Sequence, residues 1–546
     1  MSNQDIVRRE RKQFSWKPVV GGALLVGLAG GVIIAEPALK NVLEQATNQT
    51  GEPASFDAPM AEIAAADTLL SCVATPQLAN GGGSTDSQFT PDTTKQTTGI
   101  TASVLSDAGA RIPGVSATPL TEQASKDSEA TAKELTKRIP YEQASQVVSN
   151  GADGATTVVG KVLVDDQKTF LKLAAQSLGK QSALISGQRT TLSEDGDLAG
   201  FSAAPCMSPS HDQWLVGAST AVENTSILTI SNPSSSAATV SVRAYGSTDN
   251  VPNVGTLDRL VIAPGEHYST LLGGVAPDDS AVTFRVQSQG GAVSASIQQS
   301  SLRGLTPAGI DYISAGARAA TTSVIPFVWV QPQADSTSLG KGTNGQSSAS
   351  QLMISVPGAA DAKVTAKAIG SDGKSHDIPL PETLKAGRTT AISLAELPAG
   401  SYAVRLTSDR SVVASARSVR GKAADQPHDA AYTSSAQRLS QRQLVTLPAG
   451  GKPYVLFSTD DAAATVSLRS IDSKGRLGKA IEQSIPANSA YMFDPKTLGD
   501  VRSFTVDTSG GAVYGGGLSF AGATGITTFA IQPSPTAAQG IPVNLP

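Results

Sequence analysis

The sequence contains little of what most catalytic and metal-binding proteins depend on. Of its 546 residues, two are cysteine, four are histidine, and 4% are aromatic. Two cysteines cannot build a zinc site alone or a dense disulfide scaffold. Charged residues make up 16%, and 42 Lys and Arg against 46 Asp and Glu leave a formal net charge of −4. A nearly neutral chain with no basic block argues against nucleic acid as a partner.

Turn-forming residues, in contrast, are abundant. The chain has 52 glycines and 31 prolines, a composition that predicts many turns and few helices. Its length corresponds to about three to five domains.

One uncharged apolar run lies near the N-terminus, at residues 18–35. It is at the short end of what crosses a bilayer, and basic residues precede it. We expect a single transmembrane helix here, with residues 1–17 in the cytoplasm, 36–59 as a spacer and the bulk of the chain extracytoplasmic. The alternative is a cleaved signal peptide, but Ile33 and Ala35 make a poor cleavage site.

Cys72 and Cys206 are the two cysteines. Outside the cell an even pair is most simply a disulfide, which we predict here. It would close a loop of 134 residues, and the loop-entropy estimate for its stabilisation is roughly 5 kcal/mol as an upper figure. The alternative is two free, buried thiols.

Residues 60–210 are predicted to form a β-rich module with a polar insertion at about 80–138. Strand-like segments lie at 100–105, 156–164 and 182–191. Within the insertion, residues 121–138 have helix-forming composition but almost no apolar face. They predict a solvated helix or a disordered segment.

The strongest internal signal is a pattern that occurs three times. Alternating apolar and polar residues, typical of a half-buried strand, are followed by a turn and then by a second alternating stretch. The first stretches lie at 236–246, 361–370 and 463–473, with Val240, Val364 and Val466 in equivalent places. The second stretches contain the pairs Gly290-Gly291, Asp409-Arg410 and Gly510-Gly511. These pairs predict a β-hairpin in each copy.

The sequence therefore predicts an all-β protein. A single N-terminal transmembrane helix and a β-rich, disulfide-closed module precede three tandem immunoglobulin-like β-sandwich repeats. We place the repeats at 211–320, 321–435 and 436–546. A solenoid or propeller needs shorter, more regular units and is the second choice.

The motifs that usually carry chemistry are incomplete. Residues 370–375 end in Gly-Lys-Ser, but two residues separate the glycines where a phosphate-binding loop needs four. His211, His376 and His428 each precede an aspartate. Adjacent side chains of an extended chain point opposite ways, so these pairs fit turns better than catalysis. We predict no catalytic, cofactor-binding or metal-binding residues.

The segments around the second cysteine are distinctive. They are residues 196–200, 205–209, 214–217, 228–233 and 303–312. Together they resemble an uncharacterised actinobacterial family of membrane-anchored exported proteins, a domain of unknown function, over roughly residues 60–546. The resemblance implies an envelope location and, as a partner, an envelope protein or a membrane glycosyltransferase. The chain departs from the family pattern after Cys72, where Val73 replaces a proline.

Two functions fit these observations. The first is a non-enzymatic, membrane-anchored envelope protein with a structural or protein–protein interaction role and no cofactor. The alternative is a carbohydrate-active envelope enzyme or its carbohydrate-binding accessory subunit, with Asp311, Asp212, Trp214 and Trp329 as candidates. A cleft with two carboxylates about 5–10 Å apart would favour the enzyme.

Overall fold

The structure of the protein is a computed structural model. It describes residues 60–61, 65–79, 93–107, 111–123, 130–138, 160–178, 181–248, 250–251, 254–341, 349–440, 442–472, 475–499, 501–533 and 541–542. The predicted transmembrane segment 18–35 lies outside the described residues. Within them, no helix has the length and apolarity needed to cross a bilayer.

The chain divides into two compact units. In the described part of the smaller unit, β1 (Met60–Ala61) pairs antiparallel with β35 (Ile541–Pro542). The larger unit, residues 62–539, contains every other described element. These elements are β-strands, short 3₁₀ turns and one short α-helix, α3 (Gln333–Leu339). The predicted all-β class is therefore confirmed for the described part of the chain.

The larger unit contains four segments that we call modules, each made of two sheets around a hydrophobic cluster. Module 1 has β2 (Thr68–Cys72), β3 (Gln96–Leu105), β4 (Val115–Pro119), β6 (Lys133–Thr136), β7 (Gly160–Asp165), β8 (Leu171–Ala175), β9 (Leu184–Ser193) and β10 (Gly200–Pro205). Module 2 has β11 (Asp212–Ala218), β12 (Asn224–Ser231), β13 (Ala238–Tyr245), β14 (Asn250–Val251), β15 (Leu260–Ile262), β16 (Glu266–Leu271), β17 (Val282–Gly290), β18 (Ser294–Arg303) and β19 (Thr306–Ser314). Module 3 has β20 (Ala320–Val330), β21 (Gln351–Ser355), β22 (Val364–Gly370), β23 (Ser375–Ile378), β24 (Thr389–Ser393), β25 (Gly400–Arg420) and β26 (Asp429–Ser434). Module 4 has β27 (Arg442–Thr446), β28 (Lys452–Thr459), β29 (Ala464–Ile471), β30 (Ile481–Ile485), β31 (Ala490–Phe493), β32 (Ser503–Gly510), β33 (Val513–Ala521) and β34 (Gly525–Ala530).

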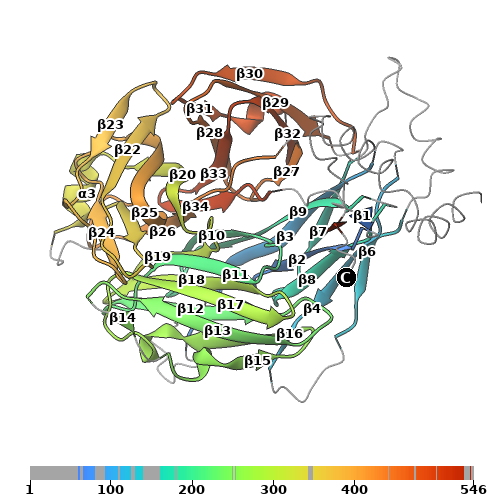
Figure 1. Ribbon diagram of the computed structural model, residues 1–546, viewed down its shortest axis with the longest axis horizontal. Helices are drawn as coiled ribbons and strands as arrows, with labels where there is room; N and C mark the ends of the chain where they lie inside the picture. Colours follow the sequence, from blue (N-terminus) through green and yellow to red (C-terminus); the bar gives the residue numbers. More distant parts are fainter. Residues whose placement is uncertain are drawn as a thin grey trace, which may run out of the picture. The chain divides into compact units, whose positions relative to one another are not determined.

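The four modules share one strand connectivity (Figure 1). In module 4 the sheets run β27-β32-β29-β30 and β31-β28-β33-β34. Module 1 repeats this order as β2-β8-β4-β6 and β7-β3-β9-β10, and module 2 as β11-β17-β13-β15 and β16-β12-β18-β19. Module 3 does the same, except that the long strand β25 belongs to both of its sheets. Module 1 is therefore a fourth copy of the arrangement that the three sequence repeats form.

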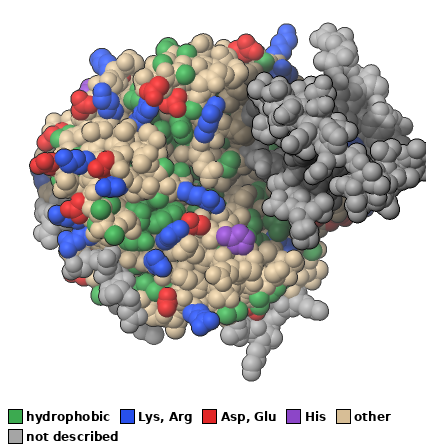
Figure 2. Space-filling model, in the orientation of Figure 1, with side chains coloured by type: hydrophobic (Ala, Val, Ile, Leu, Met, Phe, Trp, Pro, Cys, Tyr) green, Lys and Arg blue, Asp and Glu red, His purple; other side chains and the backbone are tan. Residues whose placement is uncertain are grey.

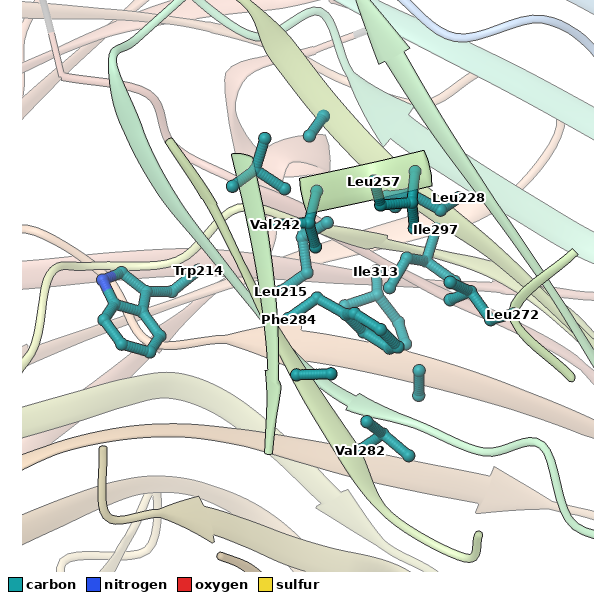
Figure 3. Close-up of a cluster of buried hydrophobic side chains, with 14 of the residues drawn as sticks. Trp214, Leu215, Leu228, Val242, Leu257, Leu272, Val282, Phe284, Ile297 and Ile313 are labelled. Atoms are coloured by element: carbon teal, nitrogen blue, oxygen red, sulfur yellow. The ribbon is translucent and has the colours of Figure 1, made fainter. Parts of the chain in front are cut away.

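Alternation along these strands places apolar side chains between the two sheets of each module. In module 2, Leu215, Phe284 and Ile313 come from different strands and are fully buried in one cluster (Figure 3). Burying such a side chain stabilises the fold by about 1.5–3 kcal/mol. The equivalent valines Val240 and Val466 are also fully buried, as the repeat pattern predicts.

The predicted hairpins are wrong. The strands on either side of Gly290-Gly291, β17 and β18, belong to different sheets, and so do β32 and β33. In module 3, β25 runs without a break through Asp409-Arg410. Gly290 has φ +80°, and a Cβ there would lie 2.4 Å from the carbonyl oxygen of Ala237. The glycine thus permits a tight crossing from one sheet to the other.

The cysteine prediction is confirmed, because Cys72 and Cys206 form a disulfide and both are buried. The helix predicted within 121–138 is wrong where the structure describes this segment. Lys133–Thr136 is strand β6, which pairs with β4. Thr121–Glu122 is strand β5, which pairs in parallel with β16 of module 2. Backbone pairing with β4 and with β16 explains why this polar segment is extended and not helical.

Candidate functional site

The last strands of the four modules, β10, β19, β26 and β34, meet in the larger unit (Figure 1). We call them the junction strands. β10 and β26 each contact both β19 and β34. Their sequences align over six residues, which are Gly200–Pro205, Gly309–Ser314, Asp429–Ser434 and Gly525–Ala530. The first position is glycine in three strands and Asp429 in the fourth.

The carboxylate of Asp429 accepts one backbone N–H from each junction strand. The N–H groups of Phe201 and Ile526 donate to Oδ2 at 2.8 and 3.1 Å. Those of Ile310 and Ala430 donate to Oδ1 at 3.1 and 2.9 Å. All four donors occupy the second aligned position of their strands. A single buried side chain therefore links all four modules and uses its full acceptor capacity in doing so.

Asp311, at the third aligned position of β19, forms a second link one layer farther along. Its Oδ1 accepts the N–H of Ala203 at 3.3 Å and the hydroxyl of Thr527 at 2.9 Å. Its Oδ2 accepts the N–H of Tyr432 at 3.2 Å. These donors come from modules 1, 4 and 3, so the two carboxylates are equivalent in role.

Glycine at the first aligned position leaves space for this arrangement. A Cβ at Gly200 would lie 2.6 Å from Cγ2 of Ile310 and 3.0 Å from Oδ1 of Asp429. Any larger residue would push the neighbouring strand away from the carboxylate.

The electrostatics of the junction reflect its burial. Asp311 and Asp429 are 0% and 1% exposed. Burial raises the pKa of Asp429 to about 7 and that of Asp311 well above its ordinary range, and the N–H donors oppose both shifts. Because every described partner of these oxygens is a donor, the two groups serve as acceptors for the fold.

A cavity of about 490 Å³ lies at the carboxyl ends of the junction strands. The sixth aligned residue of every strand lines it, namely Pro205, Ser314, Ser434 and Ala530. We call it the junction cavity. All four modules thus contribute to one hollow of the size that small-molecule sites have, about 300–1,000 Å³.

The four carbohydrate-site candidates are not brought together. Asp311 is buried in the junction. Asp212 lines the junction cavity, but both of its oxygens accept from Arg285, at 2.8 and 2.9 Å. Trp214 is buried and stacks on Tyr245 with ring centroids 5.8 Å apart. Trp329, half-buried, lies in module 3 and meets a phenylalanine of module 4 edge-on.

The three His-Asp pairs are also separate, and none of these histidines bonds to its neighbouring aspartate among the described residues. His211 is exposed and contacts the hydroxyl of Ser288 at 3.2 Å. His376 lies edge-on to Tyr402. His428 lies outside the strands, directly before β26, but it is only 1% exposed and directly precedes the Asp429 link. Within the described residues, no group of three or more His, Cys, Asp or Glu is placed to hold a metal ion.

We expect His428 to make the protein less stable as the pH falls from 6.5 to about 4. Burial, with Arg303 and Arg417 nearby, lowers its pKa from 6.5 to about 4. Between these pH values His428 binds a proton in the unfolded chain but not in the folded chain. His428 therefore contributes stability above pH 6.5 that is lost on acidification, about 3 kcal/mol in all.

The measurement is the free energy of unfolding of wild type and H428Q at several pH values. The free energy of unfolding of wild type minus that of H428Q should fall by about 3 kcal/mol between pH 7 and 4. Asp429, whose raised pKa gives a contribution that is lost as the pH rises, titrates in both proteins and cancels in the difference. H211Q, an exposed-site control, should give a flat difference. A flat difference for H428Q as well would contradict the assignment.

Sequence reasoning missed Asp429. The signal was the six-residue match between GIDYIS, DAAYTS and GITTFA, at the same place in three copies. A charged residue where the other copies have glycine marks a position at which one copy differs in role.

The part of the chain that carries most of the junction matches a known family. A family of unknown function, DUF5719, matches residues 148–496. The matched range includes Cys206, Asp311 and Asp429 and ends before β34. No curated protein is significantly similar to the chain. The predicted resemblance to a domain of unknown function is confirmed, whereas actinobacterial origin and membrane anchoring stay predictions.

Proposed function

The chain belongs to the family of unknown function DUF5719, and we propose that it is a non-enzymatic, membrane-anchored envelope protein that binds a partner or ligand. We also propose that its modules are tandem immunoglobulin-like β-sandwiches, with module 1 as a fourth copy beside the three that the sequence predicts. The uncharged run 18–35 supports the anchor, and the disulfide supports an oxidising compartment outside the cytoplasm.

The single observation that carries the non-enzymatic role is the use of the carboxylates. A glycosidase needs one carboxyl as acid and a second as base or nucleophile, both facing the substrate. Here Asp429 accepts four hydrogen bonds from groups of the fold and Asp311 accepts three, and Asp212 is held by Arg285. Among the described residues that line the junction cavity, Asp212 is the one carboxylate. The arrangement supports holding a ligand more than cleaving one.

The partner we propose is an envelope protein or a membrane glycosyltransferase, with the membrane itself bound through the N-terminal helix. Nucleic acid is not proposed. Positive and negative side chains are interspersed on the face shown in Figure 2, which supports neither a basic groove nor long-range attraction of a polyanion.

Topology tests the location. A protease added to intact, wall-stripped cells should degrade everything after about residue 40 and leave cytoplasmic control proteins intact. Protection of the C-terminal module under the same conditions would show that this module is cytoplasmic and would contradict the proposed location.

Activity tests the non-enzymatic role. Incubating the purified protein with isolated envelope polysaccharide should release no new reducing ends above a buffer control. Release that the D212N variant abolishes would instead establish the carbohydrate-active alternative.

A further inference from the structure

The junction cavity carries polar side chains that the fold leaves uncommitted. They are Ser208, Ser314, Ser435, Gln437 and Gln532. Among the described residues, none of these side chains has a hydrogen-bond partner. They come from the ends of all four modules, so donors and acceptors surround one hollow. Hydroxyl and amide groups of this kind suit a ligand that itself carries several hydroxyls.

The charges at the cavity are unbalanced. Asp212 is neutralised by its two-pronged contact with Arg285. Arg318 also lines the cavity, is exposed and makes no ion pair with any described residue. The described lining therefore has one unpaired positive group and no unpaired negative one. A guanidinium in this position favours a carboxylate or phosphate, which it binds through two parallel N–H bonds.

Apolar surface completes the lining. Pro205, Pro326 and Phe529 face the same hollow and offer no hydrogen bonds from their side chains. Small-molecule sites combine such apolar walls with a few polar groups that fix the orientation of the ligand. The carbon face of a ring has room to pack here while its hydroxyls reach the serines and glutamines.

We infer that the junction cavity binds a small polyhydroxylated ring compound with one negative group, a sugar acid or a sugar phosphate, whose anion contacts Arg318. This inference rests on the proposed function, because it names the ligand class for a protein that binds and does not cleave. The unpaired Arg318 disfavours amino sugars, which carry a positive ammonium group. The limited volume of the cavity disfavours a long unbranched polysaccharide chain lying wholly inside it.

Calorimetric titration of the full chain in detergent tests the inference. The probes are glucuronate, glucose 6-phosphate, uncharged glucose and glucosamine. We expect saturable binding of at least one anionic sugar, with glucose and glucosamine about tenfold weaker or worse. Tighter binding of glucuronate would indicate a carboxylate ligand, and tighter binding of glucose 6-phosphate would indicate a phosphate ligand. R318Q should weaken the anionic sugars about tenfold, the effect of losing about 1.4 kcal/mol.

Two further variants control the result. R243Q removes an exposed arginine of module 2 that does not line the cavity, and it should leave binding unchanged. A530W fills the cavity at the end of β34 and should abolish binding while circular dichroism stays that of wild type. The inference is overturned if no anionic sugar binds the wild type, or if binding persists equally in R318Q and A530W. If no anionic sugar binds but the topology and activity tests give the expected results, the ligand inference is wrong and the proposed function still stands.

Discussion

Replacing Asp429 with alanine is expected to lower the free energy of unfolding of the larger unit by at least about 4 kcal/mol. The carboxylate satisfies one N–H from each of four modules, and all four donors lie where water does not reach the side chain. A buried donor left without an acceptor costs about 1–3 kcal/mol. Four such losses exceed the effect of most single substitutions.

The loss should also be visible in cooperativity. Modules that share one acceptor gain by folding together, so wild type should unfold in denaturant as one transition. D429A should unfold earlier and in more than one step. D429N keeps one oxygen but turns an NH₂ group toward two donors, and we expect it to lose about half as much. The measurement is circular dichroism against guanidinium concentration.

D425A is the matched control, because Asp425 is exposed and four residues away in the same segment. It should change the free energy of unfolding by no more than about 0.5 kcal/mol. A D429A protein within about 1 kcal/mol of wild type would show that the four donors find other acceptors, and the junction would then not depend on this residue.

The strands themselves were predictable from residue alternation. Val240, Val364 and Val466 mark equivalent strands, which the structure has as β13, β22 and β29. Alternation identifies the face of a strand that is buried, so it located core residues in modules 2, 3 and 4. The disulfide was predictable for another reason, since two cysteines allow a single intramolecular pairing.

The pairing of strands was not predictable, because alternation does not say which neighbour a strand bonds to. Gly290-Gly291 has the composition of a hairpin turn but carries the chain between sheets. Module 1 was not identified as a copy for a related reason. Its fourth strand, Lys133–Thr136, is short and polar and carries no core signal.

The junction lies beyond sequence reasoning on one chain. Phe201 and Asp429 are 228 positions apart, yet their N–H and carboxylate are in contact. Asp311 was singled out from its motif, but as a candidate of the alternative carbohydrate-active or carbohydrate-binding function, because a carboxylate in a conspicuous motif is equally consistent with chemistry and with a buried link. Burial and the identity of the donors decide between these roles, and neither is written in the local sequence.

Arg189 gives the second large effect. Its side chain is 0% exposed in β9, and its guanidinium donates to the carbonyl oxygens of Val73, Gln167 and Thr169. Burial lowers its pKa to about 10, so it remains charged at neutral pH. Replacing it with methionine keeps an unbranched apolar stem but leaves three carbonyls without this donor. We expect R189M to lower the free energy of unfolding by about 3–5 kcal/mol.

The control for this change is R138M, the same substitution at an exposed arginine of module 1, where about 0.5 kcal/mol or less is expected. R189K should fall between the two, because a single ammonium group cannot reach three carbonyls as the planar guanidinium does. The Val73 carbonyl directly follows Cys72, so the disulfide and Arg189 hold the same end of β2. The R189M loss should therefore be larger when the disulfide is reduced than when it is intact. Equal losses in both states, or R189M matching R138M, would show that Arg189 does not hold this part of module 1.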